Sequence, residues 1–197
     1  MEAHYSSFMK PLSTASLHQL RRWFWILVLA NSLYIILMHF ILQPLNAGEI
    51  VSFEMAKKTP VAENILLNWK AAGKYDKAIV GVYMDFLFIV LYTFGLAVGS
   101  LFLSRITKHE IVGRAGKIFS YLLILAGICD VVENIAMLKS LQGTLKRWNV
   151  MLAYDMAATK FGIIILTILF IIICLIFWGL NFIEADRKAP RSSTSEA

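Results

Sequence analysis

The apolar residues of this chain come in long blocks rather than at the period of an amphipathic helix or a strand. A helix needs about 20 mostly apolar residues to cross the hydrocarbon core of a bilayer. Blocks of this length predict four spans, at about residues 23–42, 78–103, 118–138 and 161–183. Four helical spans indicate an all-α integral membrane protein. Each span leaves the membrane on the side opposite to its entry, so successive spans run in opposite directions. The expected fold is a four-transmembrane-helix up-down bundle.

The connection between the first two spans carries a helix signature of its own. Thr59 is suited to the N-cap, Pro60 to the first helical position and Gly73 to the terminator. The apolar residues between them fall on one side of a helix: Val61, Ile65, Leu66 and Trp69. We therefore expect a short interfacial helix at about 60–72, which lies flat on the membrane surface or caps the bundle. An ordinary amphipathic connector is the simpler interpretation.

Two further local signals concern helix ends and helix contacts. Ser16, followed three residues later by Gln19, is a weak capping box and predicts the start of the first helix. Gly95 and Gly99 form a GxxxG pair in the second span, which favours the close approach of another helix. The polar tail at 184–197 is expected to be disordered.

Composition excludes a soluble domain. The chain is 58% hydrophobic and only 16% charged, with a mean hydropathy of +0.67, whereas soluble domains carry about 25% charged residues. The formal charge of +6 does not indicate nucleic acid, because the Lys and Arg residues lie in connections and tails without an aromatic-interleaved basic face. Cys129 and Cys174 lie within apolar blocks and are interpreted as small core residues.

The positive charges also predict an orientation. In an up-down bundle the N-terminal segment 1–22, the connection between the second and third spans, and the C-terminal tail lie on one side. Their Lys and Arg residues are packed into short segments beside the spans. Such segments stay in the cytoplasm, so we expect both termini there.

The third span contains Asp130-Val131-Val132-Glu133-Asn134, two carboxyls and an amide in an otherwise apolar helix. At about 100° per residue, Glu133 lies about 60° to one side of Asp130 and Asn134 about 40° to the other. All three therefore share one narrow face. The bundle brings the end of this span to the same membrane surface as polar residues from the other helices: His39, Gln43, Asp85, Asp155 and Lys160. Tyr92 lies seven residues after Asp85 and so shares its face.

An ionisable residue at the centre of a span costs at least about 2.5 kcal/mol, so several together favour a function. The preferred hypothesis is an enzyme that acts by acid–base chemistry on a lipid or other apolar substrate. Asp130 and Glu133 would be the catalytic acid and base, and Asp85 would orient the substrate or stabilise positive charge. The remaining polar residues are candidates for substrate binding: Asn134, Tyr92, Lys160 and His39.

Two other classes of function remain open. One is proton- or cation-coupled transport, or a channel subunit. The other is a non-catalytic protein in which Lys160 pairs with Asp130 or Glu133 to fix helix register; alone, a lysine at a span end is more typical of snorkelling to the interface.

No cofactor is predicted. A divalent metal held by His39 and the three carboxylates is a weaker alternative, because no pair of histidines has metal-ligand spacing. The expected partners are membrane lipid, a small apolar ligand or a second copy of the chain, and no nucleic acid.

Overall fold

The computed structural model describes residues 14–143 and 145–188. Within these residues all regular structure is helical, and six helices contain most of the chain: α2 (Leu17–Leu42), α3 (Ala47–Glu54), α4 (Thr59–Ala71), α5 (Tyr75–Ile106), α6 (Glu110–Gln142) and α7 (Arg147–Lys188). Of these, α2, α5, α6 and α7 are long and apolar enough to cross a membrane. The all-α expectation is confirmed, and the four long apolar helices indicate an integral membrane protein.

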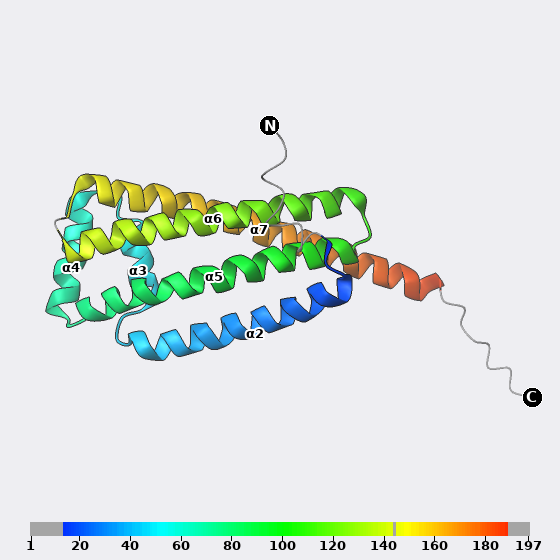
Figure 1. Cartoon of the computed structure of the whole chain (residues 1–197), viewed down its shortest axis with the longest axis horizontal. Helices are drawn as coiled ribbons and strands as arrows, with labels where there is room; N and C mark the ends of the chain where they lie inside the picture. The colour runs from blue at the N-terminus through cyan, green and yellow to red at the C-terminus, as the bar shows by residue number, and fades with distance from the viewer. Residues whose placement is uncertain (1–13, 144, 189–197) are drawn as a thin grey trace, which may run out of the picture.

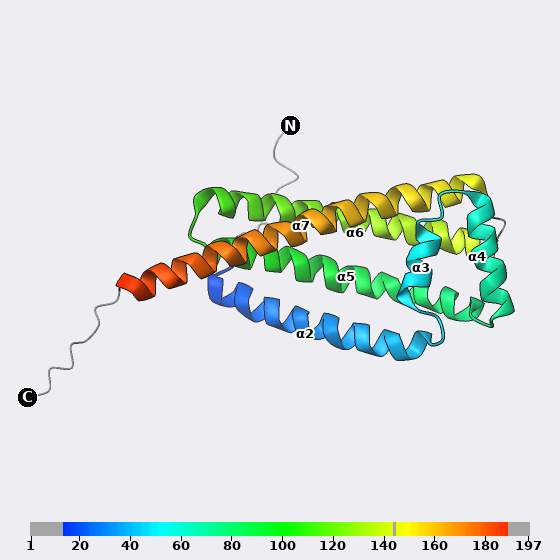
Figure 2. The same cartoon turned by 180° about the vertical axis from the view of Figure 1, so that it is seen from behind.

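The four long helices run beside one another along the long axis of the molecule (Figures 1 and 2). Helix α5 is at the centre of the packing, because it contacts α2, α6 and α7. Helix α6 also packs along α7, whereas α2 packs chiefly against α5 and lies on its outer side. The arrangement therefore leaves α2 attached to the other long helices mainly through α5.

Small residues allow α5 and α6 to approach closely. A Cβ atom at Gly116 would lie 2.1 Å from Ser104 Oγ and 2.9 Å from the Ser100 carbonyl oxygen of α5. The buried Ser120 hydroxyl donates a hydrogen bond across the interface to the Ala97 carbonyl oxygen at 2.9 Å. Small and hydroxyl-bearing residues at helix contacts are typical of membrane bundles, where close backbone approach supplies the packing energy.

The contact between α2 and α5 uses the glycine pair. Gly95 faces Asn31 and Gly99 faces Phe24, with distances of 3.0 Å and 3.2 Å from an added Cβ atom. Asn31 also donates a hydrogen bond from Nδ2 to the Leu91 carbonyl oxygen at 3.0 Å. The predicted close approach at the GxxxG pair is thus confirmed, with α2 as the partner helix.

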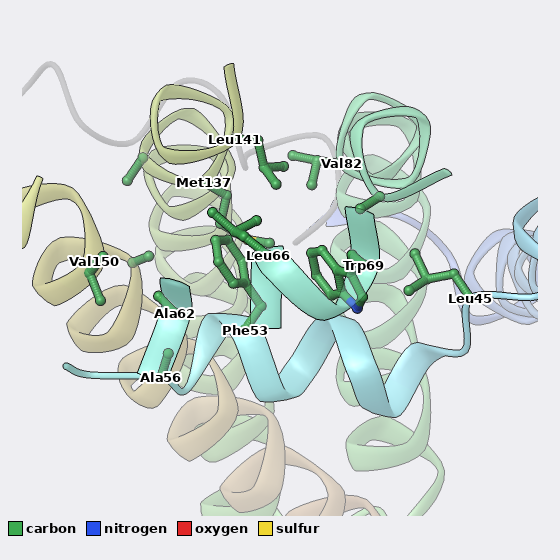
Figure 3. Packing of buried hydrophobic residues seen from close by; sticks show 13 residues of the cluster. Leu45, Phe53, Ala56, Ala62, Leu66, Trp69, Val82, Met137, Leu141 and Val150 are labelled. Carbon is green, nitrogen blue, oxygen red and sulfur yellow. The ribbon is translucent and has the colours of Figure 1, made fainter. Parts of the chain in front are cut away.

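The first connection holds two helices, α3 and α4, which pack across one end of the bundle (Figure 3). Their side chains form an apolar cluster with residues of α5, α6 and α7, in which Phe53 of α3 and Trp69 of α4 have ring centroids 5.3 Å apart. Leu66 packs beside Met137 in the same cluster. This packing fixes the position of α3 over the bundle.

Several local predictions need correction or extension. The sequence analysis missed α3, which begins with a capping box between Asn46 and Glu49. Thr59 is the first residue of α4 rather than its cap; the N-cap is Lys58, without a side-chain cap hydrogen bond. The capping box of Ser16 and Gln19 is confirmed, with both hydrogen bonds present.

Three of the long helices begin well before the expected spans. Helix α2 starts at Leu17, α6 at Glu110 and α7 at Arg147, whereas the apolar blocks start at 23, 118 and 161. The difference arises because hydropathy detects only the part of a helix that is apolar, and backbone hydrogen bonding continues through polar turns. Helix α7 continues to Lys188, past the expected start of the tail; residues 1–13 and 189–197 lie outside the described residues.

Candidate functional site

The amine of Lys160 lies among three carboxyls from two other helices. Its Nζ atom is 2.6 Å from Asp130 Oδ1 and 2.9 Å from Glu133 Oε2, both on α6, and 3.6 Å from Glu54 Oε2 at the end of α3. Lys160 is 5% exposed and Glu133 is 0% exposed. Lys160, a candidate residue from the sequence, is thus the buried cation of a polar cluster with Glu54, Asp130 and Glu133, and it does not snorkel to the interface.

Two hydrogen bonds connect the cluster to α5. The Tyr92 hydroxyl donates to Asp130 Oδ2 at 2.7 Å, and Asn134 Nδ2 donates to Asp85 Oδ2 at 2.8 Å. Because Lys160 donates to Oδ1 of Asp130, both oxygens of this carboxyl are held. The structure thus brings together six of the seven candidate residues from the sequence: Asp85, Tyr92, Asp130, Glu133, Asn134 and Lys160.

The helical period of α6 explains why its three polar residues reach one site. Asp130, Glu133 and Asn134 are all buried, whereas Ile128 and Ile135 of the same helix are exposed. The preceding turn contributes Gly127, whose added Cβ atom would meet Thr93 Oγ1 of α5 at 2.7 Å. The polar face of α6 therefore turns towards α5 and α7, in the interior of the bundle.

Acids outnumber cations in this site. Glu54, Asp85, Asp130 and Glu133 surround a single described lysine. Buried carboxyls cannot all be ionised beside one ammonium, so some must be protonated or neutralised by a bound cation. Neither oxygen of Glu133 accepts a hydrogen bond from a described residue, although Lys160 is close.

Glu54 is a site residue that the sequence analysis missed. It is 7% exposed, and burial raises the pKa of its carboxyl above the ordinary 4.5, an effect that the nearby Lys160 ammonium opposes. The residue was overlooked because it lies in a connection rather than in an apolar block. The capping box at Asn46 could have revealed α3, after which Ile50, Phe53 and Glu54 fall on one helical face.

A cavity of about 740 Å³ opens onto the cluster. Its walls come chiefly from α2, α5 and α7, with further residues from α3 and α6, and are mostly apolar, with Ile35, Phe88 and Ile164 among them. Glu133 is not among the lining residues and lies behind the others. Polar residues also line the cavity. Those of the cluster are Glu54, Asp85, Tyr92, Asp130, Asn134 and Lys160, and others include Asn31, Ser32, His39 and Asn46.

His39 is the one candidate residue that the structure keeps apart from the cluster's hydrogen bonds and ion pairs. It lines the cavity from α2, its Nε2 atom lies 3.4 Å from Gln43 Nε2, and its ring packs edge-on against Phe40. In the part of the chain that the structure describes, no three His, Cys, Asp or Glu side chains are grouped so as to hold a metal ion.

The chain was compared with known proteins by family, by sequence and by structure. No protein-family model, no curated protein and no solved structure matches it.

Proposed function

We propose that this protein is an integral membrane enzyme that performs acid–base chemistry on a lipid-like, amphipathic substrate. One observation carries the proposal: the mostly apolar cavity between α2, α5 and α7 ends at a cluster of buried carboxyls and a lysine. Apolar cavities with a few convergent polar groups are the usual form of small-molecule sites. An amphipathic molecule fits this cavity, because its apolar part matches the apolar walls and its polar part matches the cluster.

The contacts favour different roles for the two acids of α6. Asp130 lines the cavity and is held at both oxygens, so it is the group positioned to exchange a proton with the substrate. Glu133 lies behind it, on the other side of the Lys160 amine, and acts as the second acid–base group through that lysine. Asp85, fixed by Asn134, orients the polar part of the substrate. The surplus of acids allows one to be protonated while another is ionised, as acid–base catalysis requires.

A structural role is the second candidate, and the ion pairs favour it. Lys160 of α7 pairs with Asp130 and Glu133 of α6, so the cluster joins two helices. Breaking a buried pair is strongly destabilising whether or not the site is catalytic. Stability and activity therefore have to be measured on the same variants.

The test replaces acids by amides of the same shape: Asp130→Asn, Glu133→Gln and Asp85→Asn. The control is Asp155→Asn, an exposed carboxyl on α7. We expect the lipid composition of cell membranes to change when the wild type or the control is produced, and not when the three site variants are produced. Asp85→Asn breaks no ion pair between described residues and should remain folded in detergent, whereas Asp130→Asn and Glu133→Gln should lose stability without unfolding. An unchanged lipid composition with the wild type contradicts the enzyme, and unfolding of all three site variants favours the structural role.

We further propose that α2, α5, α6 and α7 cross the membrane in alternating directions, with both termini in the cytoplasm. This arrangement keeps the basic residues beside the spans, such as Arg21, Arg22 and Arg105, on the cytoplasmic side. The cluster then lies in the half of the bilayer away from the cytoplasm, beneath α3 and α4.

A further inference from the structure

The cavity at the cluster adjoins a second one between the same three helices. The second cavity has a volume of about 890 Å³ and extends towards the opposite ends of α2, α5 and α7. Both cavities are lined by Phe24, Leu96 and Ile171, which mark their junction. Along α5, the path from Tyr92 at the cluster to Ile106 in the second cavity is about 21 Å at 1.5 Å per residue. That length exceeds half of the hydrocarbon core, which is about 30 Å thick.

Two carboxyls that face the first cavity are less closely paired with Lys160 than the acids of α6 are. Asp85 lines the cavity and forms no ion pair with any described cation; its one described hydrogen bond comes from Asn134. Glu54 also lines it and is more than nine-tenths buried. Its Oε2 atom accepts no hydrogen bond from a described residue and is 3.6 Å from Lys160 Nζ, farther than either Asp130 or Glu133. Lys160 is thus held more closely by the two acids of α6 than by Glu54.

We propose that the molecule held here is a long-chain amphiphile with a cationic amine head. The amine binds the carboxyls of Glu54 and Asp85, and the chain extends through the junction at Leu96 into the second cavity. This inference rests on the proposed function and names the substrate class of the same site. An amine donates charge-assisted hydrogen bonds, which are roughly twice as strong as neutral ones. An alcohol leaves the two acids without a cation, and a carboxylate or phosphate head is repelled by them.

Three probes with the same chain and different heads test the head: hexadecylamine, hexadecanol and hexadecanoate. Each is titrated into the purified full-length protein in an uncharged detergent near neutral pH, and the bound fraction is measured by native mass spectrometry. We expect the amine to bind at least about tenfold more tightly than the alcohol, because only the ammonium adds a positive charge that compensates the carboxylates, and the carboxylate to bind most weakly. Equal affinity for amine and alcohol overturns the assignment of the head.

Variants of Glu54 and Asp85 test whether these two carboxyls bind the amine head. Glu54→Gln and Asp85→Asn should each weaken hexadecylamine binding at least about fivefold, because each removes a charged acceptor, and should leave hexadecanol binding unchanged. Glu63→Gln on α4 and Asp155→Asn on α7 are the matched controls, since both residues are exposed. Unchanged affinity for hexadecylamine in both site variants overturns the proposal. If a variant fails to fold, the comparison of the three probes on the wild-type protein still tests the assignment of the head.

A further variant tests the path of the chain. Leu96→Trp narrows the junction between the cavities. It should weaken the binding of hexadecylamine and leave the binding of octylamine unchanged, because the shorter chain does not reach the junction. Equal effects on the two amines overturn the path through the junction. None of these assays needs turnover. Loss of the amine preference while the membrane lipid composition still responds therefore overturns this inference alone, whereas the absence of any lipid response overturns the proposed function.

Discussion

Lys160 is the residue on which the charge balance of the cluster depends. It is buried, and its amine contacts acids from two other helices. Burying a lysine requires partners that compensate for the lost hydration. Conversely, the acids need the lysine, because no second described lysine or arginine forms an ion pair with Asp130 or Glu133.

Replacing Lys160 by methionine should therefore destabilise the protein by about 3–5 kcal/mol, because it leaves buried acids without their cation. Chemical unfolding in detergent micelles measures the change. The matched control is Lys146→Met, an exposed lysine just before α7, which should change stability by less than about 0.5 kcal/mol. Adding Glu133→Gln to Lys160→Met should recover part of the loss, since the two side chains are in contact and their effects are not additive. Equal stability of wild type and Lys160→Met contradicts the ion pairs.

At the scale of elements, the contact between α5 and α6 sets the distance between the two halves of the site. Tyr92 and Asp85 on α5 reach Asp130 and Asn134 on α6. These hydrogen bonds require the backbones of α5 and α6 to lie close together, which Gly116 and Gly127 of α6 permit. At Gly116 the obstacle to a side chain includes a backbone atom, the Ser100 carbonyl oxygen. A backbone atom cannot rotate out of the way.

Gly116→Ala should thus destabilise the protein by about 1–3 kcal/mol, the usual cost of overpacking. Gly113→Ala on the same helix is the matched control, because an added Cβ atom there meets nothing within 4 Å. The control should be neutral or more stable by up to about 1 kcal/mol, the difference in helix propensity between Gly and Ala. Thermal and chemical unfolding in detergent distinguish the two variants, and equal behaviour contradicts the close contact.

At the scale of the whole molecule, α3 and α4 pack as a cover across one end of the bundle (Figure 3), and the polar cluster lies beside α3, which contributes Glu54 to it. Glu54 belongs to this cover and also contacts Lys160. The cover is fastened elsewhere by an ion pair between Glu49 of α3 and Lys74, whose atoms are 2.8 Å apart. Helix α3 therefore connects an ion pair at the end of the bundle, Glu49 with Lys74, to the Lys160 site.

The proposed orientation predicts which surface each connection faces. In a background that lacks Cys129 and Cys174, both free and buried, single cysteines are placed at two exposed positions, as Lys70→Cys on α4 and Lys108→Cys between α5 and α6. A membrane-impermeant maleimide should label the first in intact cells and the second only after permeabilisation. The reverse pattern contradicts cytoplasmic termini, and labelling of both in intact cells contradicts the alternating arrangement.

The sequence by itself determined the four apolar helices and the shared face of the α6 acids. Long apolar blocks need a nonpolar solvent, and the period of the α-helix places Asp130, Glu133 and Asn134 on one side whatever surrounds them. Local chemistry likewise determined the capping box at Ser16 and the close contact at Gly95 and Gly99, since both depend on residues three or four apart.

Only the tertiary structure decided which partners these residues have. Lys160 was a candidate companion of the acids, and the packing of α7 against α6 places its amine between Asp130 and Glu133, which lie about thirty residues earlier in the chain. Glu54 enters the site because α3 folds back over the bundle, and His39 stays outside the cluster's bonds although its depth in the first span matched. Periodicity determines which residues share a face of one helix, whereas the rotation and position of each helix, and the fold of its connections, depend on all the contacts at once.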